Sequence, residues 1–496
     1  MHRAGAALWL DELMADLYNQ LSDWFLRDGL AAAVFSIAGF VLALFMVARL
    51  VGEKRAPANT FAWILVVVLL PWVGVPLYLL IGGRKLRKIA EKKTPVAPRL
   101  PQGAEPTQTP CDSPIAHTIV SAGGTPPVPG NTLRLLTNGE DAYAALEEQI
   151  RNAKSHIHIT TFILSRDDTG RRIVKLLAQK AREGVKVRLL LDFVGSLLST
   201  STFVQPIRKA GGQVATFMPV IPFTPRGSAN LRSHRKIAIF DHCTAIVGGH
   251  NLAKEYMGPT RFARRWQDFG AVVEGPAASL LNEVFIQDWC FATGENTETL
   301  RTEIPPTAAA KVRGETELQV VASGPDVPGD PLYEGIVSMI QEARESIWIV
   351  TPYFIPDDVL MRSLIVKARA GRDVTLILPR RSDHPIVDLA RRHFVRELRK
   401  AGARVLLFGP GMMHSKAMII DDNLALFGSA NFDLRSLFVN FEIGVVVHTP
   451  ADVREIKHWA TALTYRSHPP KPDRKRRTRV VGRIAEEISR LMAPLL

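Results

Sequence analysis

The sequence contains the stretch His234-Arg235-Lys236-Ile237-Ala238-Ile239-Phe240-Asp241, and its pattern recurs in His414-Ser415-Lys416-Ala417-Met418-Ile419-Ile420-Asp421. Both stretches read His-x-Lys-x-x-x-x-Asp. After six further residues each leads into a turn that ends in Asn, either Gly248-Gly249-His250-Asn251 or Gly428-Ser429-Ala430-Asn431. A pattern of this kind that recurs at one internal spacing indicates a duplicated unit. We therefore expect one active site built from two halves.

The duplication extends beyond the motifs, because other segments recur in the same order ahead of each one. Residues 153–159 match 343–349, and residues 207–211 match 398–402. Each unit reads as helix, strand, helix, strand, helix and then the motif strand. The two units must therefore share one architecture.

Short apolar runs at residues 187–191 and 374–378 suit strands that are buried on both faces. The sequence thus predicts an α/β fold of two tandem α/β/α sandwich halves in a pseudo-twofold arrangement. We place the first half at residues 131–300 and the second at residues 317–467.

Ahead of the two halves lie two stretches without charged residues, 29–48 and 61–83. At roughly 1.5 Å per helical residue, each is long enough to cross a hydrocarbon layer of about 30 Å. We expect a hairpin of two transmembrane helices within residues 1–93, with a kink in the second at Pro71 and Pro76. A signal peptide is the alternative for the first stretch, but acidic residues precede it and a second span follows.

The distribution of positive charge predicts the orientation of this hairpin. Few basic residues lie in the turn between the spans, whereas many follow the second span: Arg84, Lys85, Arg87, Lys88, Lys92 and Lys93. The positive-inside rule then places both halves in the cytoplasm. The three cysteines, Cys111, Cys243 and Cys290, form neither a disulfide framework nor a metal-binding spacing, which suits a reducing compartment.

Two further segments flank the halves. Residues 94–130 are rich in Pro and Gly and are expected to form a linker, with a short helix near 115–120. Residues 468–496 form a basic tail followed by an amphipathic helix, in which Val481, Ile484, Ile488 and Leu491 recur at helical spacing. This helix can either lie on the membrane or pack on the protein, and the sequence leaves both open.

The motif spacing suits chemistry on phosphate. Side chains alternate across a strand, so His234 and Lys236 should point to one face, as should their counterparts His414 and Lys416. The Gly-containing turns, at Gly248 and Gly249 and at Gly428 and Ser429, should let backbone N–H groups approach an anionic oxygen closely. No cluster of carboxylates suggests a metal, and we expect no cofactor.

At these residues the chain resembles the phospholipase D superfamily over nearly all of residues 131–467, and within it the bacterial cardiolipin synthases. The narrower resemblance rests on Leu231-Arg232-Ser233-His234-Arg235-Lys236, Trp266-Gln267-Asp268, Thr351-Pro352-Tyr353-Phe354 and the segment from Gly428 to Glu442. Gly249 departs from the superfamily pattern, in which Ser is commoner. Ser233 stands where Asn is more often found.

The resemblance implies phosphatidyl transfer through a covalent phosphohistidine, with phosphatidylglycerol as substrate and cardiolipin and glycerol as products. By analogy His234 is the nucleophile and His414 the acid and base, although pseudo-symmetry leaves the opposite assignment open. The groups implied to hold the non-bridging phosphate oxygens are Lys236, Lys416, Asn251 and Asn431. The resemblance also implies that Glu442 orients one imidazole, with Asp268 as its counterpart after an insertion of six residues in the first half.

Some of these residues have a structural alternative. Asp241 and Asp421 can belong to the catalytic set or can anchor the turn at the end of each motif strand. Glu442 and Asp268 can be ordinary solvated carboxylates. The cluster Arg261, Arg264 and Arg265 can contact a lipid headgroup or form a solvated face.

The sequence is compatible with five functions. The preferred one is cardiolipin synthesis at the bacterial inner membrane; the rivals are a membrane-bound hydrolase and a transferase that uses phosphatidylethanolamine as donor. A net charge of +14 would also suit a nuclease, but the membrane hairpin argues against a nucleic-acid partner. A non-enzymatic scaffold is disfavoured because both motifs are intact. The sequence leaves an oligomer open.

Overall fold

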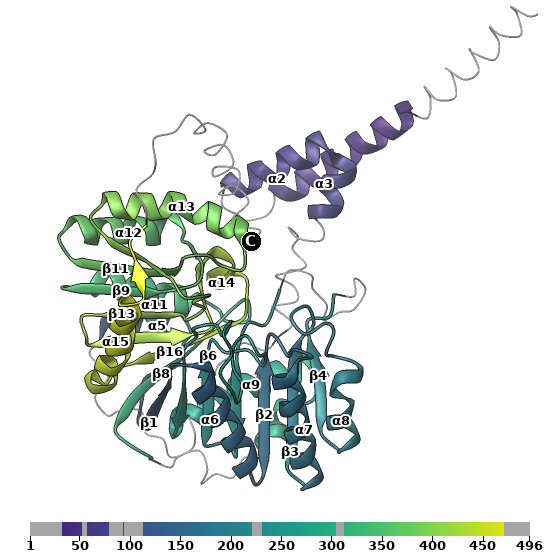
Figure 1. The fold of residues 1–496 in the computed structure, drawn as a ribbon. Helices are drawn as coiled ribbons and strands as arrows, with labels where there is room; N and C mark the ends of the chain where they lie inside the picture. The colour runs from purple at the N-terminus through teal and green to yellow at the C-terminus, as the bar shows by residue number, and fades with distance from the viewer. Residues whose placement is uncertain are drawn as a thin grey trace, which may run out of the picture. The chain divides into compact units, whose positions relative to one another are not determined.

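The computed structural model describes residues 32–51, 57–78, 93, 113–220, 231–303 and 312–470. The chain separates into two compact units, Met1–Arg87 and Lys88–Leu496 (Figure 1). Several predictions fall outside the described residues: the ends of the two predicted spans at 29–31 and 79–83, the linker over 94–112, and the basic tail and amphipathic helix beyond residue 470.

In the first unit, the helix Ala32–Val51 is long and apolar enough to cross a membrane, judged by length and composition alone. The predicted second span is not one continuous helix, because α2 (Pro57–Leu69) ends before α3 (Pro71–Leu77) begins. Pro71 has no N–H to continue the helical ladder, and Leu70 leaves helical geometry at φ −136°. The kink predicted from the prolines therefore lies at Pro71, and one helix in the described part of the chain is both long and apolar enough for a span.

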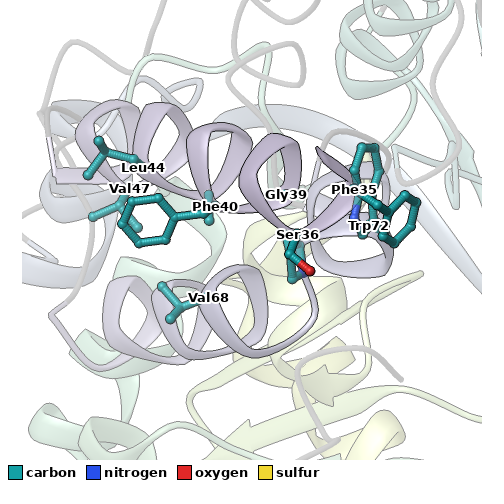
Figure 2. A pocket seen from close by; sticks show the side chains of 10 residues that line it. Phe35, Ser36, Gly39, Phe40, Leu44, Val47, Val68 and Trp72 are labelled. Carbon is teal, nitrogen blue, oxygen red and sulfur yellow. The ribbon is translucent and has the colours of Figure 1, made fainter. Parts of the chain in front are cut away.

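These helices of the first unit pack against one another. Leu50 of the long helix shares a buried apolar cluster with Val67 of α2. Phe35 stacks on Trp72, with ring centroids 4.5 Å apart. Gly39 allows this approach, because a Cβ at that position would lie 2.9 Å from Trp72 Nε1. An apolar pocket of about 480 Å³ remains between the long helix and the α2–α3 segment (Figure 2).

The second unit is built on one mixed sheet of 15 strands (Figure 1). One side, here called the first strand set, has the order β1-β7-β6-β5-β2-β3-β4. The other side, the second strand set, has the order β8-β16-β14-β13-β9-β11-β12-β17, and antiparallel pairing of β1 with β8 joins the two sets. The first set comprises β1 (Val128–Leu136), β2 (His156–Thr161), β3 (Lys186–Asp192), β4 (Gln213–Phe217), β5 (Ile237–Phe240), β6 (Thr244–Gly248) and β7 (Gly270–Glu274). The second comprises β8 (Thr316–Ser323), β9 (Ser346–Val350), β11 (Asp373–Pro379), β12 (Arg404–Phe408), β13 (Ala417–Ile420), β14 (Leu424–Gly428), β16 (Glu442–Val447) and β17 (Ser467–His468).

The two strand sets pair in the same way. In the first set β2, β3 and β4 run parallel, whereas β5, β6 and β7 pair antiparallel. In the second set β9, β11 and β12 run parallel, whereas β13, β14 and β16 pair antiparallel. β3 and β11 are buried except at their first residues, which confirms the buried strands predicted at 187–191 and 374–378. The predicted mixed α/β class is confirmed as well.

Helices cover both faces of the first strand set (Figure 1). α6 (Gly139–Asn152) and α7 (Asp168–Arg182) pack on the face that carries Ile157 and Ile159 of β2. α9 (Pro276–Thr293) packs on the opposite face, where Phe285 stacks on His158. Alternation along β2 thus separates an aliphatic core from a face that admits polar groups.

The second strand set is covered in a similar way. α11 (Pro331–Glu342) and α12 (Asp358–Arg369) pack on the face that carries Ile347 and Ile349, and α15 (Pro450–Thr464) lies on the other face, with Lys457 over the Trp348 ring. α7 and α12 both begin after an Asp whose carboxylate caps the helix. The remaining elements of this unit are α8 (Gln205–Lys209), α10 (Thr297–Arg301), α13 (Pro385–Lys400), α14 (Leu434–Phe438), the 3-10 turn Thr202–Val204 and a small parallel pair of β10 (Phe354–Ile355) with β15 (Phe432–Asp433).

The end of the predicted linker is ordered structure. α5 (Pro114–Ser121) contains the helix predicted near 115–120, and its Ile115 and Ile119 lie in the same buried cluster as Ile336 of α11. β1 begins at Val128, three residues ahead of the predicted start of the first half. α5 therefore belongs to the core of the second unit, and β1 belongs to its sheet.

Candidate active site

Both motif histidines lie just ahead of the strands that were expected to carry them. β5 begins at Ile237 and β13 begins at Ala417, so each motif histidine and lysine precedes regular strand structure. The prediction that these side chains lie within the motif strands is therefore wrong by one to three residues.

Each motif is instead held by a segment of the opposite strand set. His234 N–H donates to the Phe441 carbonyl at 2.9 Å, and Phe441 N–H donates to the Arg232 carbonyl at 2.9 Å. In the same way His414 N–H donates to the Gln267 carbonyl at 2.7 Å, and Gln267 N–H donates to the Met412 carbonyl at 2.8 Å. This reciprocal pairing brings the two motifs together.

Glu442 and Asp268, the residues that follow these two bridges, hold the imidazoles. His234 Nδ1 lies 3.1 Å from Glu442 Oε2, and His414 Nδ1 lies 2.7 Å from Asp268 Oδ2. Both carboxylates have 0% exposed side-chain surface, so neither is an ordinary solvated group. A carboxylate on Nδ1 fixes the proton there and leaves Nε2 of each ring for chemistry.

The turns after the motif strands support the two carboxylates differently. The Ser429 hydroxyl donates to Glu442, whereas a Cβ on Gly249 would lie 2.1 Å from Asp268 Oδ1. The departure from Ser at Gly249 thus has a structural reason, since only glycine leaves room for the shorter acid in this position. Gly428 is likewise pressed against β16, because a Cβ there would lie 2.1 Å from the Ile443 carbonyl.

One N–H group in each turn is already bonded in or next to a neighbouring strand. Gly249 N–H donates to the Phe269 carbonyl at 2.9 Å, and Ser429 N–H donates to the Ile443 carbonyl at 2.9 Å. These two N–H groups therefore cannot bind an anionic oxygen as predicted. Gly248 and Gly428 allow close packing against the neighbouring strands. Gly249 and Ser429 lie against the carboxylates Asp268 and Glu442.

A pocket of about 220 Å³ contains His234, His414, Asn251 and Asn431 among its lining residues. Asn251 Oδ1 accepts the Ile163 N–H at 3.1 Å, and the Asn251 side chain also hydrogen-bonds Tyr256 on the pocket wall. The pocket thus holds two imidazoles and two amides.

The two motif lysines lie buried beside the histidines. Lys236 Nζ donates to the His234 carbonyl at 2.8 Å, and Lys416 Nζ lies 2.7 Å from His414 Nδ1 and 3.2 Å from its Nε2. The two residues are only 4% and 2% exposed. Both lysine side chains are therefore shielded from bulk water beside the histidines.

Burial shifts the titration of all these groups. It lowers the pKa of Lys236 to about 7 and that of Lys416 to about 8. Burial, together with the charge of Lys416, lowers the pKa of His414 to about 3, and burial also lowers the pKa of His234. Although burial opposes it, the charges of Lys416 and His414 hold the pKa of Asp268 below its ordinary value. An anionic group placed among these residues would favour their protonated forms.

Asp241 and Asp421 lie outside this pocket. Asp241 accepts backbone N–H bonds from 154–156, the shortest at 2.7 Å, and Asp421 accepts them from 344–346, the shortest at 2.6 Å. Both residues have positive φ, 49° and 51°, at the turn that ends the motif strand. Their contacts are those expected if they anchor the turn. Neither residue lines the pocket, as a catalytic role would require.

Sequence reasoning did not single out several side chains that complete the pocket. Tyr256 packs edge-on against His414 with ring centroids 5.0 Å apart, and Phe162 packs in the same manner against His234 at 5.3 Å. On the pocket wall the Tyr353 hydroxyl donates to Asp383 Oδ1 at 2.6 Å. Tyr353 lies in the segment Thr351-Pro352-Tyr353-Phe354, which carries part of the family resemblance. No local sequence pattern predicts that Asp383 or Tyr256 lines the pocket.

The arginine cluster takes no part in the pocket. Arg265 donates to the Lys254 and Thr260 carbonyls at 2.6 and 2.5 Å, while Arg261 and Arg264 are exposed. None of the three lines the pocket, so the headgroup-contact alternative finds no support here. Among the residues that the structure describes, no group of three or more His, Cys, Asp or Glu could hold a metal ion.

Comparison with known proteins identifies the family. Residues 146–289 and 336–463 match the family described as "Cardiolipin synthase, PLD-like domain", and residues 40–83 match "Phospholipase_D-nuclease N-terminal". The cardiolipin synthase of Geobacillus kaustophilus is 32% identical over 494 residues, which cover 95% of each chain. Cardiolipin synthase 1 of Bacillus cereus is 34% identical over 461 residues, which cover 90% of each chain.

Among solved structures, phosphatidylserine synthase of Haemophilus influenzae is similar with a TM-score of 0.57. The likeness covers 73% of this chain and 95% of that chain at 15% identity, and it shows a shared fold. The family matches cover the two segments that carry the reciprocal motifs, and the relatives align along nearly the whole sequence. The chain therefore belongs to the cardiolipin synthase family of the phospholipase D superfamily.

Proposed function

We propose that this protein is a cardiolipin synthase that transfers a phosphatidyl group from one phosphatidylglycerol to a hydroxyl of another and releases glycerol. The observation that carries the proposal is the pair of imidazoles in one pocket, each held through Nδ1 by a buried carboxylate from the opposite strand set. Such a pair offers two Nε2 atoms that can act in turn on one phosphorus.

In the first step, His234 Nε2 attacks the phosphorus of the first lipid. A P–N bond forms, the P–O bond to the glycerol headgroup breaks, and His414 gives its Nε2 proton to the departing oxygen. His414 has a pKa lowered to about 3 without substrate, and the bound phosphodiester anion raises it toward the range in which imidazole can act as an acid.

In the second step, neutral His414 takes the proton from a hydroxyl of the second phosphatidylglycerol. The hydroxyl oxygen attacks the phosphorus, the P–N bond breaks, and His234 leaves as a neutral imidazole. One phosphodiester has been exchanged for another. The proposed sequence therefore needs no nucleotide and no cofactor.

Lys236 and Lys416 are proposed to stabilise the charge on the non-bridging oxygens, aided by the amides of Asn251 and Asn431. Their burial supports this role, because interactions of fixed charges are strongest where water is excluded. Glu442 and Asp268 are proposed to orient the imidazoles, and Asp241 and Asp421 to anchor the strand-end turns that hold the motifs.

We also propose the domain organisation expected from the sequence. The shared order and pairing of strands supports two duplicated halves, at 131–300 and 317–467, related by a pseudo-twofold axis. The helix Ala32–Val51 and the family match over 40–83 support an anchor within residues 1–93 that spans the bacterial inner membrane twice. The basic residues after the second apolar stretch support a cytoplasmic location for both halves.

The test is to incubate the purified full chain with labelled phosphatidylglycerol alone and to identify the products by mass spectrometry. Cardiolipin and free glycerol in equal amounts are expected without added metal or nucleotide. Phosphatidic acid as the dominant product would instead indicate a hydrolase. A second reaction that also contains phosphatidylethanolamine tests the donor, because release of ethanolamine in preference to glycerol would replace the proposed donor.

A further inference from the structure

A second buried charged cluster lies behind the first motif, away from the pocket. Its centre is Arg235, the middle residue of His-x-Lys, whose side chain has 0% exposed surface. The Arg235 Nε–H donates to the Glu442 carbonyl at 3.0 Å, and Nη1 donates to Asp288 Oδ1 at 2.7 Å. Nη2 lies 3.4 Å from the Asp326 carboxylate. Arg235 thus connects two buried acids to the backbone of the residue that orients His234.

The fourth member of the cluster is Lys93. Its Nζ donates to Asp326 Oδ2 at 2.6 Å and also to Asp288, and its side chain is only 1% exposed. Lys93 further lies over the ring of Phe441, the residue that pairs with the His234 backbone, at 4.8 Å from the ring centroid. The cluster therefore contains two cations and two carboxylates.

Charge balance in this cluster depends on Lys93. Although burial opposes it, the charges of Arg235 and Lys93 hold the pKa of Asp326 below its ordinary value. Without the Lys93 ammonium, one cation would face two carboxylates in a site that excludes water, and a buried charge without a partner is strongly unfavourable. Relief would come from a shift of Arg235, of either acid, or of the chain segments that carry them.

The middle residue of the second motif does not form an equivalent charged cluster. Ser415 stands in place of Arg235, and its hydroxyl donates to the Gln267 carbonyl at 3.1 Å. The cluster is thus specific to His234. Lys93 lies six residues after Arg87, where the first compact unit ends, and it is separated from Asp288 by 195 residues of sequence.

We propose that Lys93 is a positioning residue for the first motif. It completes the charge balance that fixes Arg235, and through Arg235 it fixes the Glu442 backbone at the position from which the Glu442 carboxylate orients His234. Lys93 then supports the catalytic apparatus, and the site reaches its working geometry only when Lys93 is docked. This inference rests on the proposed function for its assay.

The test compares full-length variants in the transfer of labelled phosphatidylglycerol to cardiolipin. Lys93→Met should lower kcat at least about tenfold and leave KM within about twofold, because orientation of the nucleophile is lost and lipid contacts are kept. Lys93→Arg, which keeps the charge, should retain most of the wild-type rate. The double variant Lys93→Met with Asp326→Asn restores charge balance and should recover most of the lost kcat. Lys175→Met, at an exposed lysine of α7, is the matched control and should behave as wild type.

Thermal unfolding of each variant separates positioning from loss of fold, and the double variant keeps the test decisive if Lys93→Met fails to fold. Wild-type kcat in folded Lys93→Met would overturn the proposal, as would a double variant no better than the single one. Absence of cardiolipin formation by wild type would count against the proposed function alone, since every variant is compared with wild type in one assay.

Discussion

Asp268 accepts a hydrogen bond from His414 at 2.7 Å, although Asp268 precedes β7 in the first strand set and His414 precedes β13 in the second. Glu442 and His234 form the reciprocal pair. Each imidazole is therefore oriented by an acid from the other side of the β1–β8 junction. Neither side supplies both a motif histidine and the carboxylate that orients it.

The first prediction concerns these acids. Asp268→Asn keeps the shape of the side chain but removes the charge that stabilises the imidazolium and fixes the tautomer of His414, so the rate of transfer should fall by at least about 100-fold. Glu442→Gln should be comparably impaired through His234. Rates of cardiolipin formation, measured alongside unfolding temperature, would check this, and near wild-type rates in either folded variant would contradict the proposed roles.

The turn glycine supplies a second prediction. In Gly249→Ala the new Cβ would lie 2.1 Å from Asp268 Oδ1, so the carboxylate must move and transfer should drop about 100-fold. Ser429→Ala is the matched change at the equivalent turn. It removes only a hydroxyl whose place a water molecule can take, so its activity should stay within about tenfold of wild type. Equal effects of the two substitutions would show that the close approach at Gly249 is unimportant.

The third prediction is a pH dependence set by the buried lysines. Burial lowers the pKa of Lys236 to about 7 and of Lys416 to about 8, so each ammonium is present below its pKa and loses its charge as the pH rises through it. Since kcat/KM reports groups of the free enzyme, it should fall in two steps, as the pH rises through about 7 and then through about 8. In Lys236→Arg the guanidinium stays charged, so the lower of the two transitions should disappear. A profile that stays flat to pH 10 in wild type would rule out lysines with lowered pKa.

Much of the scaffold was predictable because it depends on local patterns. The apolar runs at 187–191 and 374–378 are confirmed as β3 and β11, since burial on both faces leaves a signal in every residue of the strand. The helix near 115–120 was also predicted, but its membership in the core of the second unit was not. That membership depends on contacts with α11, which lies about 200 residues later and leaves no trace in the local sequence.

The candidate site shows the same limit. The two motifs and the acids Asp268 and Glu442 were found from repetition and resemblance. Their crossed pairing depends on backbone hydrogen bonds at Gln267 and Phe441. Every residue type except proline can make such bonds, so the side chains there do not predict the pairing. Lys93 was counted only as part of a basic run after the second apolar stretch, because a lysine in a basic segment gives no sign of burial against distant acids.

The fourth prediction tests how much of the N-terminal region the chemistry needs. A variant that begins at Lys88 keeps Lys93 and α5, and it should turn over a short-chain soluble substrate while losing most activity on vesicles. A variant that begins at Asn131 lacks both, and also the first residues of β1, so it should lose activity on either substrate. Full activity of the longer variant on vesicles would make the apolar N-terminal region dispensable. Equal rates of the two variants on the soluble substrate would show that Lys93 and α5 are dispensable for the chemistry.

The last prediction separates the roles of the two histidines, which the reciprocal geometry leaves equivalent in form. If His234 is the nucleophile, His234→Ala can form no phosphatidyl-enzyme, even from a p-nitrophenyl phosphatidyl ester whose leaving group needs little protonation. His414→Ala should behave differently: it should still release p-nitrophenol and become phosphatidylated, and the adduct should persist because no base remains to activate the acceptor hydroxyl. Peptide mapping of the added mass locates the label. Label on His414 in the His234→Ala variant, with none on His234 in the His414→Ala variant, would exchange the two assignments, and Glu442 and Asp268 would exchange their steps with them.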